Sequence, residues 1–265
     1  MTEVSVTRWR QGVLSSALDK VAEEVPIALV YNGVSHAVML ATPLDLEDFA
    51  LGFSLSEGIL RDKSDLYGIE IEKQAQGIEL RLEIATECFV HLKERRRNLV
   101  GRTGCGICGS ESLEQALRLP QLADSNQQAL IKPLSATHMQ AAFHAIQSQQ
   151  ILQQATGATH ACAWVNAQGE AVLLREDVGR HNAMDKLIGA LAKRPNQHDG
   201  FVLTSSRASV EMVQKVATAG ITVLAAISAP TGLAIRIAEA YGVTLIGFLR
   251  DNQFVIYTHK QRIKF

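Results

Sequence analysis

Cys105 and Cys108 lie three positions apart in a glycine-rich segment, Gly104–Gly109. Glycine holds neither a helix nor a strand firmly, so this segment is predicted to be a flexible loop. A cationic run precedes it (Lys93–Arg97), and Ser112 begins a capping-box pattern that predicts a helix start after it. Positive charge and the unpaired N–H groups of a helix start both favour a cysteine thiolate. The pattern therefore predicts a reactive sulfur on a loop.

Three kinds of site use a cysteine pair with this spacing. A structural zinc site needs four ligands, usually two such pairs, and the remaining cysteines, Cys88 and Cys162, stand alone. A thioredoxin-like dithiol should follow a buried strand and open a long helix, which Pro120 would cut short. A sulfur or acyl carrier on a flexible loop fits the glycines best. We expect no zinc, and the redox dithiol remains an alternative.

The composition limits the classes of protein to consider. The chain has 265 residues, 47% of them hydrophobic, which is ample for a core, and its formal net charge is -1. It therefore lacks the basic surplus of a nucleic-acid-binding protein. No segment approaches ~18 uninterrupted apolar residues, and no apolar signal core is present near the N-terminus. We expect a cytoplasmic protein with neither nucleic-acid nor membrane partners, whose cysteine pair is reactive rather than a structural disulfide.

The first part of the sequence predicts short strands and one helix. The expected strands are residues 4–9, a hairpin of 27–30 and 34–40 around Asn32-Gly33, and a second hairpin of 68–74 and 78–85. Thr42 and Pro43 are typical of a helix start, and Gly58 of a helix end. Residues 121–128 are polar and are predicted to be a linker. We therefore predict two domains, residues 1–125 and 126–265.

The second part alternates strands and helices. A helix is expected from Ser135 to about Gln154, followed by a hairpin of residues 160–165 and 171–175 around Gly169. The expected elements after it are a helix over 184–191, strands at 201–204, 221–227, 243–249 and 254–258, and helices over 207–219 and up to Tyr241. The strands are continuous apolar runs, as in sheets that are buried on both faces. This predicts an α/β layer sandwich with parallel strands at least at its end.

Polar residues gather where three of these strands lead into helices. The junctions are residues 176–182, 204–207 and 228–232, and they contain hydroxyls, arginine and helix N-termini. Such junctions bind ligands in α/β sheets, and these groups favour phosphate. Neither the Walker A motif nor the dinucleotide-binding motif Gly-x-Gly-x-x-Gly is present. Serine and threonine at these places could simply cap helices. The residues we predict to contact a nucleotide-like ligand are Asp177, His181, Ser205, Ser206, Arg207, Ser228, Ala229 and Thr231.

Four segments taken together resemble the FdhD family of sulfur carriers, which formate dehydrogenase requires for activity. They are Gly104–Gly109, Arg175–Lys186, Thr204–Ser209 and Ser228–Thr231, and the resemblance covers nearly the whole chain. It implies a cytidine-deaminase-like α/β/α layer sandwich in the C-terminal half. The smaller α+β N-terminal part would carry the flexible Cys-x-x-Cys loop at about residues 101–110. A zinc deaminase has His-x-Glu and Pro-Cys-x-x-Cys motifs at two helix starts, and this chain has neither, so no metal is expected.

The resemblance also implies a reaction. A family member takes persulfide sulfur from a cysteine desulfurase and passes it to the molybdenum cofactor, bis(molybdopterin guanine dinucleotide). This happens before the cofactor is inserted into the formate dehydrogenase catalytic subunit. Such a protein is a sulfurtransferase with a cysteine persulfide intermediate, which maps to Cys105, with Cys108 as the second thiol. A homodimer and GDP binding are also implied.

The resemblance places the guanine end of the cofactor at Phe248, Leu249, Arg250, Asp251, Asn252 and Gln253. Relatives often have a basic residue where this chain has Gln253, which removes one expected phosphate contact. Two other functions remain as alternatives. One is a chaperone that binds the cofactor without catalysis, and the other is a thiol-disulfide oxidoreductase.

Overall fold

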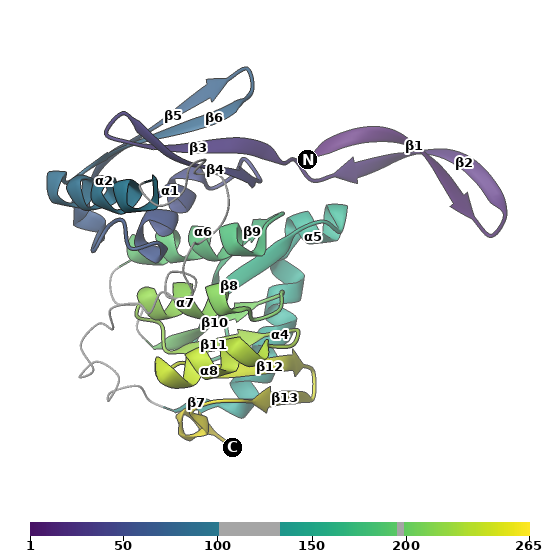
Figure 1. The fold of residues 1–265 in the computed structure, drawn as a ribbon. Coiled ribbons are helices and arrows are strands. Elements are labelled where there is room, and N and C mark those ends of the chain that lie inside the picture. Colours follow the sequence, from purple (N-terminus) through teal and green to yellow (C-terminus); the bar gives the residue numbers. More distant parts are fainter. Residues whose placement is uncertain (101–132, 195–198) are drawn as a thin grey trace.

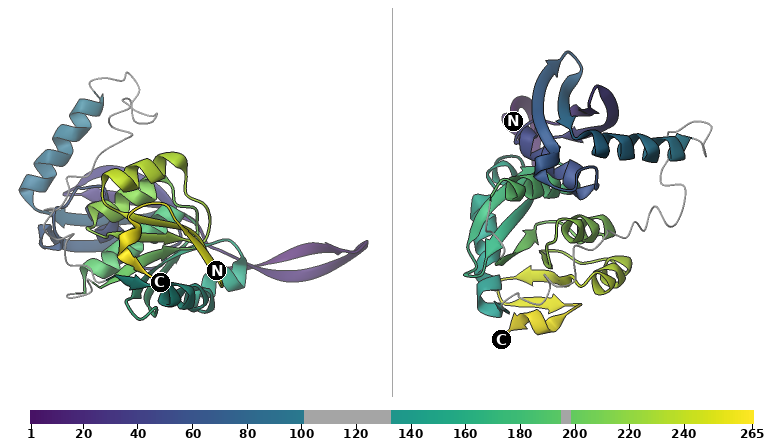
Figure 2. Two further views of the ribbon diagram at one scale, coloured as in Figure 1. Left: turned by 90° about the horizontal axis from the view of Figure 1, so that it is seen from below. Right: turned by 90° about the vertical axis from the view of Figure 1, so that its left-hand side faces the viewer.

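The computed structural model describes residues 1–100, 133–194 and 199–265, and Figure 1 shows their fold. A long hairpin projects from the body at the N-terminus (Figures 1 and 2). Its strands, β1 (Thr2–Arg10) and β2 (Val13–Val21), pair antiparallel along their whole length. The expected strand at residues 4–9 is confirmed. Its partner strand has no clear polar-apolar alternation, so the sequence pattern did not indicate it.

A four-stranded sheet follows the hairpin, with the order β4-β3-β6-β5. Its strands are β3 (Val25–Tyr31), β4 (Val34–Ala41), β5 (Leu66–Gln74) and β6 (Gly77–Ile84). Both predicted hairpins are confirmed, and Asn32 and Gly33 have the positive φ values (44° and 79°) that their turn requires. A short 3-10 helix (Lys63–Asp65) precedes β5, and helix α2 (Thr86–Val100) follows β6.

Helix α1 (Leu46–Ser56) covers one face of this sheet, and its Phe49 and Phe53 are buried there. The predicted helix start at Thr42 and Pro43 is wrong, because the structure uses Thr42 elsewhere. The Thr42 N–H donates to the Asp177 carboxylate over 3.0 Å, and its hydroxyl accepts from the backbone N–H of Val178 over 3.2 Å. These contacts to the second half hold Thr42 outside the helix.

The second half contains a six-stranded sheet with the order β13-β12-β11-β10-β8-β9. Its strands are β8 (His160–Asn166), β9 (Ala171–Asp177), β10 (Gly200–Thr204), β11 (Val223–Ala226), β12 (Thr244–Arg250) and β13 (Gln253–Ile256). Strands β10, β11 and β12 are parallel, which confirms the expected parallel core. Strand β8 runs antiparallel to β10, and β9 antiparallel to β8.

Helices cover both faces of this sheet (Figure 2). Helix α4 (Ala136–Gln149) packs on one face, and on the other lie α6 (Arg180–Ala192), α7 (Val210–Thr218) and α8 (Gly232–Ala240). At the chain end, β14 (Ile263–Lys264) follows a 3-10 turn (Lys260–Arg262) and pairs with β7 (Leu134–Ser135). The mixed α/β architecture is as predicted, and the closer likeness to cytidine deaminases stays a prediction.

Two predicted helix boundaries are wrong because residues distant in the sequence contact the helix ends. The helix expected up to Gln154 breaks at Gln150, and a separate helix α5 (Ile151–Thr156) begins because the buried Glu176 carboxylate accepts its first N–H groups over 2.8 Å. Helix α7 was expected from Arg207, but Ala208 instead pairs with Pro230 as an isolated bridge.

Helices α1 and α6 join the two halves of the chain at very short range. A Cβ on Gly52 would lie 1.7 Å from the Asp185 carbonyl oxygen, and one on Gly189 would lie 1.9 Å from the Asp48 carbonyl oxygen. Only glycine allows the two backbones to approach this closely. The predicted domain boundary at residues 125 and 126 lies outside the described residues. None of the helices in the described ranges is long and apolar enough to cross a membrane.

Candidate functional site

One edge of the six-stranded sheet gathers most of the predicted ligand residues. The carboxyl ends of β10, β11 and β12 meet there, and the antiparallel β8 brings its N-terminal end, with His160, to the same edge. Helices α6, α7 and α8 all begin at this edge, since each follows a strand that ends there. The edge therefore presents three helix N-termini, which favour an anionic group.

Backbone hydrogen bonds tie the loops of this edge to one another. The Ser205 N–H donates to the Ala161 carbonyl over 2.9 Å, and the Ile227 N–H donates to the Thr204 carbonyl over 3.0 Å. Farther along, the Phe248 N–H donates to the Ser228 carbonyl over 3.2 Å. The ends of β8, β10, β11 and β12 therefore form one continuous surface.

The predicted residues after β10 differ in accessibility. The Ser205 hydroxyl is partly accessible and accepts from the Ala161 N–H over 2.9 Å. Ser206 is buried, and its hydroxyl contacts the Thr204 hydroxyl and donates to the Arg207 carbonyl. Arg207 is exposed. Of these three residues, Arg207 and Ser205 can meet a ligand, whereas Ser206 shapes the loop.

The loop after β11 is partly open to solvent. Ser228 and Ala229 are half-buried, and the exposed Thr231 accepts through its hydroxyl from the Ala234 N–H over 3.3 Å, which makes it the N-cap of α8. A Cβ on the neighbouring Gly247 would lie 2.7 Å from Pro230, so β12 passes tightly beneath this loop.

Phe248 has an unusual backbone conformation at the end of β12. Its φ is 53°, in the left-handed region that a bulky residue rarely adopts, and it lies at a bulge between Gly247 and Arg250. The bulge directs the Phe248 side chain outward, 36% exposed, and leaves Leu249 fully buried in the core. Such strain is typical of functional sites.

The turn between β12 and β13 carries the remaining predicted guanine-binding residues. Arg250, Asp251, Asn252 and Gln253 are all exposed. Asp251 contacts His144 of α4, with 2.7 Å between the carboxylate and Nε2. Residues 248–253 thus lie at the β12 end of the edge, with only Leu249 turned inward.

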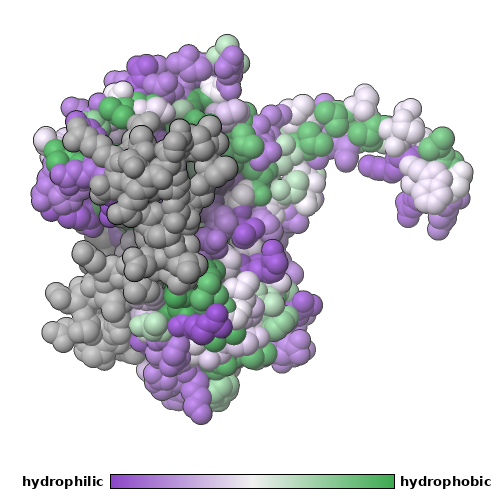
Figure 3. Space-filling model, viewed as in Figure 1, coloured by the Kyte–Doolittle hydropathy of each residue, from purple (hydrophilic) through white to green (hydrophobic). Residues whose placement is uncertain are grey.

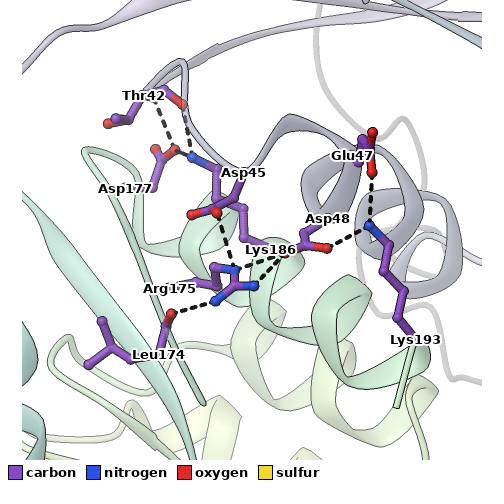
Figure 4. A network of polar contacts seen from close by, with 9 residues as sticks. All are labelled: Thr42, Asp45, Glu47, Asp48, Leu174, Arg175, Asp177, Lys186 and Lys193. Carbon is purple, nitrogen blue, oxygen red and sulfur yellow. Dashed lines mark hydrogen bonds and ion pairs between the residues drawn. The ribbon is translucent and has the colours of Figure 1, made fainter. Parts of the chain in front are cut away.

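Asp177 lies at the end of β9 but is fully buried. Figure 4 shows its carboxylate beside Thr42 and Lys186. One carboxylate oxygen lies 2.7 Å from the Lys186 ammonium nitrogen, and the other accepts from the Gly179 N–H over 2.8 Å. The Lys186 ammonium also donates to the Thr42 carbonyl over 2.8 Å. In this structure Asp177 therefore joins the two halves of the chain and does not face the strand-end surface.

Arg180 and His181 occupy the first turn of α6, which begins four residues earlier than expected. Arg180 Nε and His181 Nε2 are buried atoms with no hydrogen-bond partner in the described part of the chain. The nearest carboxylate to His181, that of Glu211, is 3.9 Å away. Burial and the adjacent Arg180 charge lower the pKa of His181. Two unpaired nitrogens at a helix start are suited to a ligand with acceptor oxygens.

His160 was not among the predicted site residues. Burial, with the Arg180 charge as a second cause, lowers its pKa, so its ring is neutral at physiological pH. The sequence signal was weak because only the antiparallel direction of β8 brings His160 to this edge. The Arg180 charge thus acts on the pKa of both His160 and His181.

A hollow of about 360 Å³ opens beside His160 at the β8 end of the edge. It is lined by Gln150, Gln153, Gly157, Ala158, Thr159, His160 and Ser205. Ser205 belongs both to the hollow and to the strand-end loops, so the two form one connected surface.

The two cysteines predicted to react, Cys105 and Cys108, lie outside the described residues. The two described cysteines are buried and free. Burial raises the pKa of Cys162 to about 12, and burial together with the Asp65 carboxylate raises that of Cys88. Neither forms a thiolate readily. Among the described residues, no cluster of three or more His, Cys, Asp or Glu side chains is arranged to hold a metal ion.

Comparisons with known proteins agree with one another. The model of the FdhD/NarQ family matches residues 22–264. The chain is 58% identical to the sulfur carrier protein FdhD of Cupriavidus necator, covering 98% of this chain and 89% of that protein. It is 54% identical to the FdhD protein of Bordetella bronchiseptica, over 97% and 93% of the two chains. The crystal structure of a candidate formate dehydrogenase accessory protein from Desulfotalea psychrophila has the same fold, with a TM-score of 0.76, 23% identity and 99% of both chains covered.

Proposed function

The chain belongs to the FdhD/NarQ family, and we propose that it is a sulfur carrier in the maturation of formate dehydrogenase. It accepts persulfide sulfur from a cysteine desulfurase. It passes this sulfur to the molybdenum cofactor, bis(molybdopterin guanine dinucleotide), in the cytoplasm, before the cofactor enters the formate dehydrogenase catalytic subunit. The observation that carries the proposal is the pair of relatives named sulfur carrier proteins, each more than half identical over nearly the whole chain.

The distribution of cysteines supports this proposal. Cys88 and Cys162 are buried, and the raised pKa of each keeps it a thiol. Cys105 and Cys108 are the remaining two of the four cysteines. Their arginine-rich and glycine-rich sequence surroundings favour a thiolate and access for a partner protein. We therefore assign the persulfide to Cys105 and the role of second thiol to Cys108.

Both sulfur-transfer steps conserve atoms and electrons, and neither requires an external oxidant. The Cys105 thiolate attacks the outer sulfur of the desulfurase persulfide, forming a new S–S bond while the desulfurase cysteine leaves as a thiolate. The Cys108 thiolate then attacks the Cys105 sulfur, which forms a Cys105–Cys108 disulfide and releases hydrosulfide to the cofactor. The two thiols supply the two electrons of this step, and a cellular dithiol reductant restores them.

The strand-end surface supports the assignment of the acceptor. Phosphate groups would lie at the helix N-termini beside Arg207 and Thr231, and the guanine end at Phe248 and the turn after β12. The unpaired nitrogens of Arg180 and His181 fit acceptor oxygens of the same molecule. GDP, which contains only the guanine end, is therefore the probe for this part of the site.

The experiment that tests the proposal is mass spectrometry of the purified chain after incubation with a cysteine desulfurase and cysteine. A carrier gains the mass of one sulfur atom on the peptide that contains Cys105, and the Cys105→Ala variant gains none. A cofactor chaperone gains no mass, and an oxidoreductase loses two hydrogens as a disulfide forms with no sulfur added beforehand and no hydrosulfide released. Either of these last two results would replace the carrier function with the corresponding alternative.

We also propose that the functional form is a homodimer. The N-terminal hairpin supports this, because Trp9, Leu14 and Leu18 lie on one of its faces and are 67–68% exposed. Figure 3 shows hydrophobic surface along the projecting hairpin. A two-stranded ribbon is marginally stable alone. A second copy of the chain would cover these side chains.

Replacing both Trp9 and Leu14 by serine is expected to convert the dimer to monomers, because it removes a cross-strand apolar pair at the tip of the hairpin. Sedimentation velocity measures the change. The control is Tyr67→Ser, since Tyr67 is 67% exposed on β5 and does not belong to the hairpin. A wild-type chain that sediments as a monomer, or a double variant that stays dimeric, would contradict the proposal.

A further inference from the structure

We infer that the hollow beside His160 binds an uncharged, flat, hydrogen-bonding ring, and that its occupant is the pterin end of the cofactor. This inference rests on the proposed function, and it adds the place where the second end of the molecule binds. The hollow has a volume of about 360 Å³, within the range of small-ligand pockets.

The lining of the hollow is polar but carries no formal charge. Gln150, Gln153, Thr159 and Ser205 provide amide and hydroxyl groups, and His160 is neutral because its pKa is lowered. Carboxamides both donate and accept hydrogen bonds, which matches the amino, oxo and ring-nitrogen groups of a 2-amino-4-oxo ring system. A phosphate would find no cationic side chain among these lining residues. The chemistry therefore favours a ring over an anion.

The walls of the hollow are held in place before any ligand binds. The buried Glu176 carboxylate accepts from the N–H groups of Leu152 and Gln153 over 2.8 Å and from the Thr159 hydroxyl over 3.0 Å. The Gln153 side-chain oxygen in turn accepts from the Thr159 N–H over 2.9 Å. These contacts fix the turn between α5 and β8. Gln150 is 6% exposed, and within the described ranges no hydrogen bond involves its side-chain amide.

The order of the strands sets the direction in which a long ligand would lie. From the turn after β12, the edge passes β11 and β10 and reaches the hollow at β8. Neighbouring strands are about 4.8 Å apart, so these three steps span about 14 Å. A dinucleotide whose two rings are joined by a pyrophosphate can extend along this line. Its phosphates then lie at the middle strands, next to Arg207, and its second ring reaches the hollow.

Binding of free pterin (2-amino-4-oxopteridine), followed by its fluorescence, tests the inference. We expect saturable binding to the wild-type chain and about tenfold weaker binding to Gln150→Leu, which removes the amide and keeps the size of the side chain. A second variant, Ala158→Trp, fills the hollow from an exposed position and should also abolish binding. The control is Gln147→Leu, which makes the same change at an exposed position of α4 away from the hollow.

The other outcomes separate this inference from the proposed function. Absence of saturable pterin binding, or equal binding by Gln150→Leu, Ala158→Trp and the control, overturns the inference. If GDP competes with pterin and Gln150→Leu weakens GDP binding, guanine occupies the hollow. That result overturns the inference as well. In each case sulfur loading of Cys105 is unaffected, so the proposed function stands. The proposed function is rejected if Cys105 of the wild-type chain takes up no sulfur from the desulfurase.

Discussion

Gly189→Ala is expected to lower the free energy of unfolding by about 3 kcal/mol or more, at the upper end of what overpacking costs. The new Cβ would lie 1.9 Å from the Asp48 carbonyl oxygen and 2.8 Å from the Gly52 nitrogen. Both neighbours are backbone atoms in the middle of a helix, so no side chain can turn away to make room. Helices α1 and α6 must instead move apart, which opens voids along both hydrophobic cores that they cover. Urea unfolding followed by circular dichroism measures the loss.

The matched control is Gly232→Ala, in the first turn of α8. A Cβ there meets only the end of the Arg236 side chain, 3.8 Å away, and the residue is helical. Alanine is favoured over glycine in a helix by up to about 1 kcal/mol, so this variant should be as stable as the wild type or slightly more stable. If Gly189→Ala were as stable as Gly232→Ala, the backbones of α1 and α6 would not approach as closely as described.

Local patterns predicted most of the secondary structure of the described residues. The Asn32-Gly33 hairpin is present, and Gly220 and Gly242 follow helix ends with φ values of 71° and 67°, as helix-terminating glycines should. Two of the helix-boundary errors have a common origin in the motif Glu176-Asp177. Glu176 starts α5 where one continuous helix was expected, and Asp177 holds Thr42 outside α1. Both errors arise from contacts between residues distant in sequence, which local propensity does not contain.

The sequence predicts the location of the candidate loops better than it predicts which of their side chains face outward. Strand-to-helix junctions in a parallel sheet converge on one edge whatever their detailed sequence, so the loops after β10 and β11 lie together as expected. Which side chains face outward depends on tertiary packing. Ser206 turns into its loop, and a bulge buries Leu249 while it exposes Phe248. Acid residues in a ligand-like motif can equally be structural, as the buried Asp177 shows.

Lys186→Met is expected to lower the free energy of unfolding by about 3–5 kcal/mol, because it leaves a buried carboxylate without its counter-charge. Lys186 and Asp177 are both fully buried, and 2.7 Å separates the ammonium nitrogen from the carboxylate oxygen. Burial lowers the pKa of Lys186, and the Asp177 charge acts in the opposite direction. Methionine has a similar volume, so the cavity term is small and the lost charge dominates. At this chain length the midpoint of thermal unfolding should fall by roughly 10 °C.

Two further variants separate this effect from a general sensitivity of α6. Lys193→Met removes the same chemical group from the end of that helix, where the ammonium lies 2.8 Å from the Asp48 carboxylate but the side chain is 41% exposed. A solvent-screened pair contributes at most about 1 kcal/mol, so this variant should stay close to the wild type. The double variant Lys186→Met with Asp177→Asn removes both buried charges and should be more stable than Lys186→Met alone. Equal losses for Lys186→Met and Lys193→Met would contradict the buried pair. A double variant less stable than Lys186→Met would mean that the hydrogen bonds from Thr42 and Gly179 to Asp177, rather than the charge pair, hold the two halves together at this point.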